Sequence, residues 1–548
     1  MIRQASAASP NEAPASDAEE FDYVIVGAGS AGCVLANRLS ASGRHSVLLL
    51  EAGPEDTNLW IHVPLGYGKL FKDKTVNWMY QTEPEPGLNG RSIFQPRGKV
   101  LGGSSSINGL VYIRGQREDF ERWRQRGNAG WGYDDVLPYF RKAEDQQRGA
   151  DAFHGTGGPL TVSNPRQADP LCEAFIRAAG ETGIPANPDF NGAGQEGAGY
   201  FQTTTRRGRR ASTAVCYLRP ARHRRNLEIR TSAPAQRILF EGRRAVAVRY
   251  RHAGTLRTAR ARCEILVSGG AYNSPQLLQL SGVGPADLLA RHGIDVVLDA
   301  AGVGHDLQDH LQVRMVMRCS KPVTINDAIN HPVRRVLTGL RYAAFRTGPL
   351  TVAAGYAGAF FKTDPRLATP DIQVHFIPFS ADKMGEKLHA FSGFTASVCQ
   401  LRPESRGSLR IKSADASVPP EIRINYLATE TDRTANVEGL KILRRVLHAP
   451  ALGPYVAAEV EPGAAIATDE ALLAYCRQYG STIYHPTSTC RMGSDALAVV
   501  DQRLRVRGIE GLRVVDGSVM PDVVSGNTNA AIIMIAERAS DMILEDAG

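Results

Sequence analysis

The chain has 548 residues, of which 43% are hydrophobic and 22% charged, so it is long enough for roughly two to four globular domains and is not a disordered polymer. Its formal net charge is +8, and arginines gather in two short runs, residues 206–210 and 222–225. We interpret both runs as solvated loops. No aromatic interleaving or nucleic-acid-binding motif accompanies them, so we expect no nucleic-acid partner.

The eight cysteines form no Cys-x-x-Cys pair, which disfavours a zinc or iron–sulfur site and a dense disulfide framework. We therefore expect no metal, and reduced thiols. Residues 1–20 are rich in Ala, Ser, Pro and Glu and lack the apolar core of a signal peptide, so we expect a flexible tail. No apolar run reaches the ~18 residues that cross a bilayer. We expect a cytoplasmic protein, and leave open a peripheral contact with the inner membrane through the arginine runs.

Near the N-terminus, the sequence predicts a strand–turn–helix–strand unit. The apolar run 21–26 indicates a buried strand, the turn GAGSAG follows at 27–32, and residues 33–39 have helical spacing. A second apolar run at 46–50 ends in Glu51. In this context the glycine pattern predicts a dinucleotide-binding turn.

Each glycine of this turn has a physical purpose. Gly27 permits a tight turn, Gly29 lets the backbone approach a pyrophosphate, and Gly32 lets helix and strand pack closely. The helix N-terminus offers free N–H groups to phosphates. Glu51 is placed to accept hydrogen bonds from a ribose diol, and its charge would repel a 2′-phosphate, which disfavours NADP.

A second glycine-rich segment, PRGKVLGGSSSING at 96–109, offers many backbone N–H groups and little bulk. Such a loop suits close wrapping of a flat ring or a pyrophosphate. The apolar run 110–113 follows directly and would anchor it.

Further along the chain, residues 263–271 predict a third buried strand that ends in glycines, 511–518 predict a fourth, and 529–544 predict a final helix with apolar residues at core spacing. Nucleotide-domain signals thus occur at both ends and in the middle. We assign 21–159, 230–310 and 481–548 to that domain, and 160–229 and 311–480 to a second domain inserted twice. Within the second domain, 373–377 and 407–411 alternate like strands of a sheet with one covered face.

Six stretches together carry a resemblance to a known family. They are DYVIVGAGSAGCVLANRLS, NGRSIFQPRGKVLGGSSSINGLVYIRG, GGAYNSPQLLQLSGVGP, GVGHDLQDH, YHPTSTCRMG and GLRVVDGSVMPDVVSGNTNAAIIMIAERASDMI. With LLEAG, they run in order from about residue 21 to 544, and the chain resembles the glucose–methanol–choline (GMC) flavoprotein oxidoreductases, most of all the bacterial alcohol and choline dehydrogenases.

The resemblance implies an α/β protein with FAD, not NAD, as cofactor. It implies a Rossmann-like FAD-binding domain assembled from discontinuous segments, beneath a substrate domain built on a six-stranded antiparallel sheet flanked by helices. The implied activity is oxidation of a primary alcohol to the aldehyde, with hydride passing to flavin N5. The electron acceptor would be a quinone, an artificial acceptor or O2. The oligomeric state is left open.

Residue by residue, the resemblance assigns a cofactor-binding set and a catalytic pair. His485 is the general base and Asn527 its partner. The cofactor-binding residues are Gly27, Gly29, Ser30, Gly32, Glu51, Ala52, Arg97, Gly98, Val100, Gly103, Asn108, Gly109, Leu110, Val111, Ala235, Gly269, Asp516, Gly517, Asn527 and Thr528. Some relatives attach FAD covalently through a histidine at the position of Ile107, so we expect non-covalent FAD here.

The stretch around His485, taken alone, leaves three interpretations open: a base, a metal ligand with Cys490, or a packed core residue, and a lone histidine is usually structural. With the surrounding motifs we interpret it as the base, because an imidazole titrates near neutrality and suits proton transfer, whereas the Asn527 amide does not titrate. Cys490 is interpreted as a small buried residue. We expect His375 to be a satisfied sheet histidine rather than a pocket residue, and His310 to pin local structure.

Four rival functions stay open beside the alcohol dehydrogenase. They are a choline dehydrogenase, an alcohol oxidase producing hydrogen peroxide, a flavin-containing hydroxynitrile lyase, and a non-catalytic flavin-binding protein. A trimethylammonium substrate needs an aromatic cage. All four tryptophans lie in the first quarter of the chain, which weakly disfavours choline, although tyrosine and phenylalanine can also form such a cage.

Overall fold

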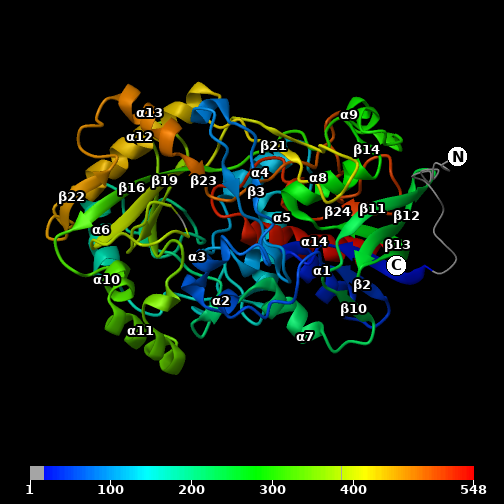
Figure 1. The fold of residues 1–548 in the computed structure, drawn as a ribbon, viewed down its shortest axis with the longest axis horizontal. Helices are drawn as coiled ribbons and strands as arrows, with labels where there is room; N and C mark the ends of the chain where they lie inside the picture. Colours follow the sequence, from blue (N-terminus) through cyan, green and yellow to red (C-terminus); the bar gives the residue numbers. More distant parts are fainter. Residues whose placement is uncertain (1–17, 384) are drawn as a thin grey trace, which may run out of the picture.

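The computed structural model describes residues 18–383 and 385–548, which form two large sheets placed side by side along the long axis of the molecule (Figure 1). The predicted tail, 1–20, lies outside the described residues except for its last three. Glu19 and Glu20 already belong to the first strand, where they pair with Ala259 and Arg260. The tail therefore ends earlier than expected.

The first sheet has the strand order β10-β2-β1-β13-β12-β11, with β24 also paired to β13. The first four strands and β24 run parallel, while β11, β12 and the start of β13 form an antiparallel meander. The bounds are β1 Glu19–Val26, β2 Val47–Leu50, β10 Leu227–Arg230, β11 Ala235–Glu241, β12 Arg244–His252, β13 Thr255–Val267 and β24 Leu512–Val514. The predicted apolar runs are these parallel strands, which are covered on both faces and so need no polar side.

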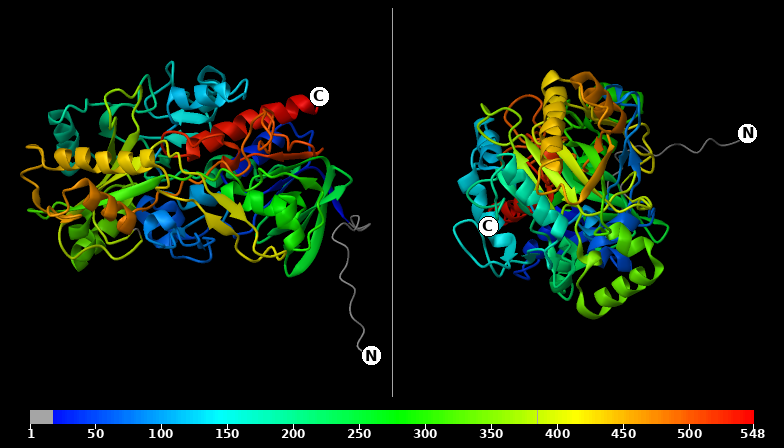
Figure 2. Two further views of the ribbon diagram at one scale, coloured as in Figure 1. Left: turned by 90° about the horizontal axis from the view of Figure 1, so that it is seen from above. Right: turned by 90° about the vertical axis from the view of Figure 1, so that its left-hand side faces the viewer.

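Helices cover this sheet. The covering helices are α1 Ser30–Leu39, α4 Arg117–Gln125, α5 Tyr133–Ala143, α8 Gly270–Leu280 and α14 Asn529–Asp546. The first and last helices lie against each other (Figure 2), and Arg38 of α1 donates to both carboxylate oxygens of Glu537 of α14 at 2.8 and 2.7 Å. Glu537 is fully buried, so this bidentate pair ties the two ends of the chain together inside the core.

The second sheet has the antiparallel order β22-β16-β19-β18-β17-β7, six strands as expected, with the short β23 added beside β16. The bounds are β7 Gly197–Tyr200, β16 Leu311–Cys319, β17 Ala357–Phe361, β18 Ile372–Ile377, β19 Gly393–Gln400, β22 Val456–Glu461 and β23 Ser481–Thr482. Helices α6 Pro170–Glu181, α12 Glu430–Leu447 and α13 Asp469–Tyr479 pack on it, with α6 and α12 on the inner strands.

Three sequence expectations need correction. β18 is buried along its whole length rather than on one face. Residues 408–410 form a separate two-stranded sheet with 421–423 (β20 Ser408–Arg410 and β21 Glu421–Arg423). Leu227–Arg230 crosses the domain boundary predicted between residues 229 and 230. It pairs in parallel with β2 and so belongs to the first sheet, where it satisfies the backbone hydrogen-bonding groups on the outer side of β2.

The remaining elements are mostly short, apart from the 14-residue helix α11. They are α2 Leu59–His62, η1 Pro64–Gly66, α3 Tyr67–Leu70, β3 Tyr80–Gln81, η2 Pro86–Leu88, β4 Phe94–Gln95, η3 Gly103–Ser106, β5 Glu144–Gln146, β6 Leu160–Val162, β8 Thr205–Arg206, β9 Arg209–Arg210, η4 Ala214–Leu218, α7 Arg219–Ala221, β14 Val283–Gly284, α9 Ala286–Arg291, β15 Leu298–Asp299, α10 Ile325–Asn330, α11 Pro332–Phe345, η5 Pro349–Thr351 and η6 Gly517–Val519. Across the described residues, none of the helices has the length and apolarity that a membrane crossing requires.

Candidate active site between the two sheets

Two adjoining cavities lie where the sheets meet. The first, of about 410 Å³, opens at the carboxyl ends of the parallel strands, where Val26, Leu50 and Val267 line it. This is where open α/β sheets bind ligands. The second, of about 140 Å³, lies under the antiparallel sheet. The two share part of their walls, formed by Ser30, Arg97, Ser104, Thr528 and Ile532.

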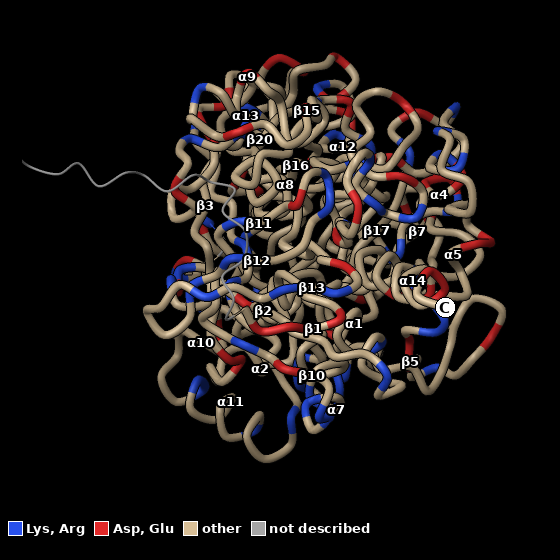
Figure 3. Tube along the Cα trace, turned by 90° about the vertical axis from the view of Figure 1, so that its right-hand side faces the viewer, with Lys and Arg blue, Asp and Glu red and all other residues tan. Residues whose placement is uncertain are grey.

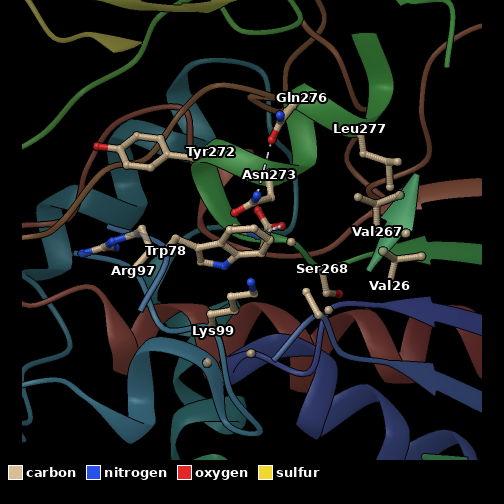
Figure 4. A pocket seen from close by; sticks show the side chains of 18 of the residues that line it. Val26, Trp78, Arg97, Lys99, Val267, Ser268, Tyr272, Asn273, Gln276 and Leu277 are labelled. Atoms are coloured by element: carbon tan, nitrogen blue, oxygen red, sulfur yellow. Dashed lines mark hydrogen bonds between the residues drawn. The ribbon is translucent and has the colours of Figure 1, made fainter. Parts of the chain in front are cut away.

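The first cavity collects most of the predicted cofactor-binding residues, and Figure 4 shows it from close by with Arg97 and Trp78 at its wall. Its lining includes Gly27, Gly29, Ser30, Glu51, Ala52, Arg97, Gly98, Gly103, Ala235, Gly269, Asp516, Gly517 and Thr528. Segments from four distant parts of the sequence therefore meet at one site.

Backbone packing shapes this cavity. A Cβ at Gly32 would lie 1.9 Å from the carbonyl oxygen of Gly27, so α1 can approach the turn only with glycine there. A Cβ at Gly103 would lie 2.7 Å from Cα of Gly29, so the two glycine-rich segments are packed directly on each other. We call residues 27–32 and 98–106 the glycine cradle.

Two predicted cofactor-binding residues do not line either cavity. Gly32 faces the turn, as its packing role requires. Val100 is fully buried in an apolar cluster with Ile61, Leu70 and Val76. Its place is therefore corrected from the cavity wall to the core beneath the cradle.

Glu51 lines the first cavity and also holds the cradle. Its two carboxylate oxygens accept from the backbone N–H groups of Ala28 and Gly53, each at 2.9 Å. Burial raises the pKa of Glu51 to about 7, and the two N–H donors oppose that rise. Each carboxylate oxygen keeps a free lone pair, so a ribose diol could still be held at this position.

Two helix N-termini meet at the shared wall. α1 begins at Ser30 and α14 at Asn529, and the Ser30 hydroxyl donates to the Asn529 side chain at 2.7 Å. Neither helix has an acidic residue in its first turn. The positive ends of both helix dipoles are therefore left for an anionic group in the first cavity.

The second cavity is lined by one face of the antiparallel sheet. In β16, β18 and β19 the alternation of strands sends Leu311, Val374 and Phe394 toward the helices and Gln312, His375 and Thr395 toward the cavity. The predicted residues that line it are Ser30, Arg97, Asn108, Gly109, Leu110, Val111, His485, Asn527 and Thr528. The catalytic pair and the flavin-side residues are thus brought together.

His485 is part of a relay of hydrogen bonds that fixes its tautomer. Nε2 of His310 lies 2.9 Å from the carbonyl oxygen of Leu401, which can only accept, so this nitrogen carries the proton. Burial lowers the pKa of His310, so its ring is neutral and Nδ1 accepts. Nδ1 of His485, 3.0 Å away, must then donate to it. The proton-free nitrogen of His485 is Nε2.

That free nitrogen points at Asn527, whose Nδ2 lies 3.1 Å away. The Asn527 amide is itself oriented by Gln373, which donates to its carbonyl oxygen at 3.2 Å. Burial, and then the neighbouring histidines, hold the pKa of His485 well below 6.5. The imidazole is therefore neutral at pH 7, with a lone pair on Nε2 beside an amide donor.

Asp309 anchors the histidine loop and was not singled out from the sequence. It accepts from the backbone N–H of His485 at 2.7 Å and from the Thr482 hydroxyl at 2.6 Å, and also from the Tyr426 hydroxyl. Tyr484, just before His485, has φ of 74°, a strained conformation for a bulky residue. Asp309 belongs to the motif GVGHDLQDH, which contributes to the family resemblance but does not by itself single out this residue.

His375 corrects an expectation. His375 lines the second cavity, and neither of its ring nitrogens has a hydrogen-bond partner among the described residues, although the residue is only 3% exposed. Burial lowers its pKa to about 4, so it is neutral. A buried, unpartnered imidazole offers one donor and one acceptor to a ligand. His310 likewise does more than pin structure, because it orients His485.

The second cavity carries positive charge. Arg97 and Arg314 line it, and no carboxylate does among the described residues. The other lining groups are mainly apolar or aromatic, including Phe71 and Tyr484, whose ring centroids are 5.1 Å apart. The cavity therefore suits a neutral ligand better than a cation.

Cys490 and its neighbours are structural. Cys490, Thr487, Ser488 and Thr489 are all fully buried, and the Thr489 hydroxyl donates to the carbonyl oxygen of Ala271 at 2.7 Å. The backbone N–H of Cys490 donates to Ser518 at 2.9 Å, which ties the histidine loop to the segment before α14.

Comparison with known proteins agrees with this arrangement. The chain matches the N- and C-terminal parts of the GMC oxidoreductase family over residues 21–312 and 403–536. It is 45% identical over 527 residues to an alcohol dehydrogenase [acceptor] of Pseudomonas putida, covering 96% of both chains. It is 44% identical to the mitochondrial choline dehydrogenase of Mus musculus, covering 96% of this chain and 89% of that one.

A solved structure supports the fold. The formate oxidase of Aspergillus oryzae, a protein that shows FAD modification, superimposes with a TM-score of 0.91 at 26% identity, covering 97% of this chain and 99% of that chain. With both family regions matched and curated relatives above 40% identity over nearly the whole length, the chain belongs to the GMC oxidoreductase family.

Proposed function

We propose that the protein is an FAD-dependent oxidoreductase that oxidises a neutral primary alcohol to the aldehyde. The observation that carries the proposal is the relay from Leu401 through His310 to His485. It leaves one unprotonated imidazole nitrogen beside the Asn527 amide, in a cavity that adjoins the glycine cradle.

The residues present fit FAD. The cradle leaves Gly29 open toward the first cavity, and two uncapped helix N-termini suit a pyrophosphate. Glu51 retains lone pairs for a ribose, and the shared wall lets a flat ring extend from the first cavity toward His485. When bound, FAD supplies the two-electron acceptor for the hydrogen on the alcohol carbon.

The proton chemistry belongs to this chain. An alcohol oxygen that replaces the direct hydrogen bond between Asn527 and His485 accepts from the amide and donates its proton to Nε2 of His485. Removal of that proton makes the oxygen alkoxide-like and weakens the adjacent C–H bond, and a positioned base of this kind contributes roughly 10²–10⁴-fold to the rate. The amide fixes the oxygen, because it cannot take the proton itself.

We propose that FAD is held without a covalent bond. Residue 107 is isoleucine, 5% exposed and packed in the apolar cluster with Ile61 and Leu70. It has no nucleophile. Acid precipitation should release the yellow flavin into the supernatant; colour that stays with the pellet would show a covalent link through another residue.

We favour a neutral alcohol over choline. A trimethylammonium group is stabilised by an aromatic cage or a carboxylate. Here the second cavity has two arginines and no carboxylate among its described residues. Tyr67, Phe71 and Tyr484 do line the second cavity, so the preference rests on the charge of its lining and not on a lack of aromatic rings.

The activity can be tested directly. Anaerobic addition of a primary alcohol should bleach the flavin, and a panel of alcohols should be run once with an artificial acceptor and once with peroxide detection. Turnover with the acceptor and little peroxide would support a dehydrogenase, with a quinone as the cellular acceptor in the proposed cytoplasmic setting. Abundant peroxide would make the protein an oxidase. A flavin that no alcohol bleaches, with cyanohydrin cleavage, would make it a lyase.

A further inference from the structure

Helix α11 exposes an apolar stripe. Val333, Val336, Leu337 and Leu340 recur at the spacing i, i+3, i+4, i+7, so they lie within about 100° of arc on one helix face. Their exposed fractions run from 58% to 61%, and Phe345 at the end of the helix is 71% exposed. Four large apolar side chains side by side on a surface indicate an interaction site.

The opposite face of α11 holds it to the protein. Thr338 and Tyr342 are its buried residues, about half a turn away from the apolar stripe. The Tyr342 hydroxyl donates to the carbonyl oxygen of Gly208 at 3.1 Å, in the turn between β8 and β9. The helix projects from the body at the lower left of Figure 1, so the stripe faces outward.

Two arginines lie beside the stripe on α11, because Arg334 and Arg341 directly follow the stripe residues Val333 and Leu340. The sequence has no acidic residue between Asp327 and Asp364. The arginines that belong to α11 or to the β8–β9 turn, and that form no ion pair within the described residues, are Arg206, Arg207, Arg209, Arg334, Arg335, Arg341 and Arg346. Figure 3 shows basic residues near α11 and α7 at the lower end of the molecule. The β8–β9 turn, which carries one of the two arginine runs, lies against the opposite face of α11 at Tyr342, so its arginines add to the positive charge at this end of the molecule.

We propose that this surface, the α11 stripe with the arginines beside it, docks the protein on an anionic lipid bilayer. Apolar side chains enter the boundary between headgroups and acyl chains, while the guanidinium groups pair with lipid phosphates. Charge complementarity favours this occupant over a second copy of the chain, because two copies would bring like charges together. A single helix about 21 Å long is also a narrow contact surface, whereas a stable dimer buries about 800 Å² per partner.

The chain that follows α11 leads into the wall of the second cavity. η5 follows α11 and contacts η1, and the next residues lead to Ala354, which lines that cavity. The backbone N–H of Ala354 donates to the carbonyl oxygen of Gly109 at 3.0 Å. Docking through α11 would therefore hold one wall of the second cavity close to the lipid.

Vesicle flotation of the purified holoenzyme tests the proposal. The wild type should float with vesicles of equal phosphatidylglycerol and phosphatidylcholine, and remain at the bottom with phosphatidylcholine alone. The double variant Leu337→Asp/Leu340→Asp should lower binding to the anionic vesicles by about tenfold or more. The double variant Arg334→Ala/Arg341→Ala should lower it by about tenfold, and added salt should reproduce that loss.

A matched control changes exposed apolar residues elsewhere. Leu256→Asp/Val296→Asp, at residues 49% and 46% exposed, should float like the wild type. Circular dichroism and turnover of a short alcohol would show that every variant is folded. A wild type that stays at the bottom, an α11 variant that floats normally, or a control that loses binding equally would overturn the proposal. So would light scattering that shows a wild-type dimer converted to monomer by Leu337→Asp/Leu340→Asp.

Discussion

The two adjoining cavities are built in different ways. The first is a backbone structure: glycines from two sequence segments pack against each other, and the ligand-facing groups are N–H donors and helix ends. The second is a side-chain structure, in which His375, His485 and Asn527 arrive from three distant segments. We infer that binding of the cofactor depends on shape in the first cavity, whereas selectivity and proton transfer depend on side-chain chemistry in the second.

The largest expected contrast is in substrate charge. Because Arg97 and Arg314 line the second cavity, kcat/KM for choline should be lower than for a neutral primary alcohol of similar size by about 100-fold or more. Steady-state assays with an artificial acceptor measure the ratio. Equal values for the two substrates would contradict the electrostatic argument and favour the choline dehydrogenase alternative.

Substitution of His310 should impair proton transfer in the second cavity without changing cofactor binding in the first. His310→Ala removes the acceptor for Nδ1–H of His485, so the base loses its fixed tautomer, and kcat should fall by about 10–100-fold while flavin content is unchanged. His310→Gln retains an acceptor oxygen and should recover part of the loss. If alanine and glutamine at this position lower kcat alike, His310 acts through packing only.

A substitution in the glycine cradle should instead weaken cofactor binding in the first cavity. Gly32→Ala places a Cβ against the Gly27 carbonyl oxygen, so α1 must shift and the affinity for FAD should fall by about tenfold. The measurement is flavin retained per chain after dialysis. Gly180→Ala in α6, where a Cβ meets nothing within 4 Å, is the control and should retain flavin normally. Normal flavin content in Gly32→Ala would show that the close approach is not needed.

The smallest expected effect is the dependence of kcat/KM on pH. The pKa of His485 lies well below 6.5 because burial disfavours the imidazolium, and the unprotonated form is the active one. Activity should therefore stay level from pH 8 to 7 and fall only as the pH drops below 6.5, where a proton occupies Nε2. A kcat/KM profile measures this limb, and a midpoint at or above pH 6.5 would count against the assignment.

The sequence predicted the first cavity better than the second for a physical reason. The turn at 27–32, the strand ending in Glu51 and the final helix are local patterns, and local patterns set backbone shape. The parallel strands were visible as apolar runs because both their faces are covered. Val100 was misplaced because one residue of a loop does not show which way it points.

Residues of the second cavity had no such local signal. β18 places His375 in the cavity only because its neighbours Val374 and Phe376 face the helices, and both faces are buried. The Leu401–His310–His485 relay joins residues that are 91 and 175 positions apart. His485 and Asn527 themselves were found through a resemblance, whereas the roles of Asp309, His310 and Gln373 follow from contacts that only the fold creates.

The most direct test of the account is the anaerobic rate of flavin bleaching by a primary alcohol in His485→Ala. Removing the imidazole removes the acceptor of the alcohol proton, so the rate should fall by about 10²–10⁴-fold with flavin content and spectrum unchanged. A bleaching rate close to that of the wild type would contradict the central claim that Nε2 of His485 takes the proton.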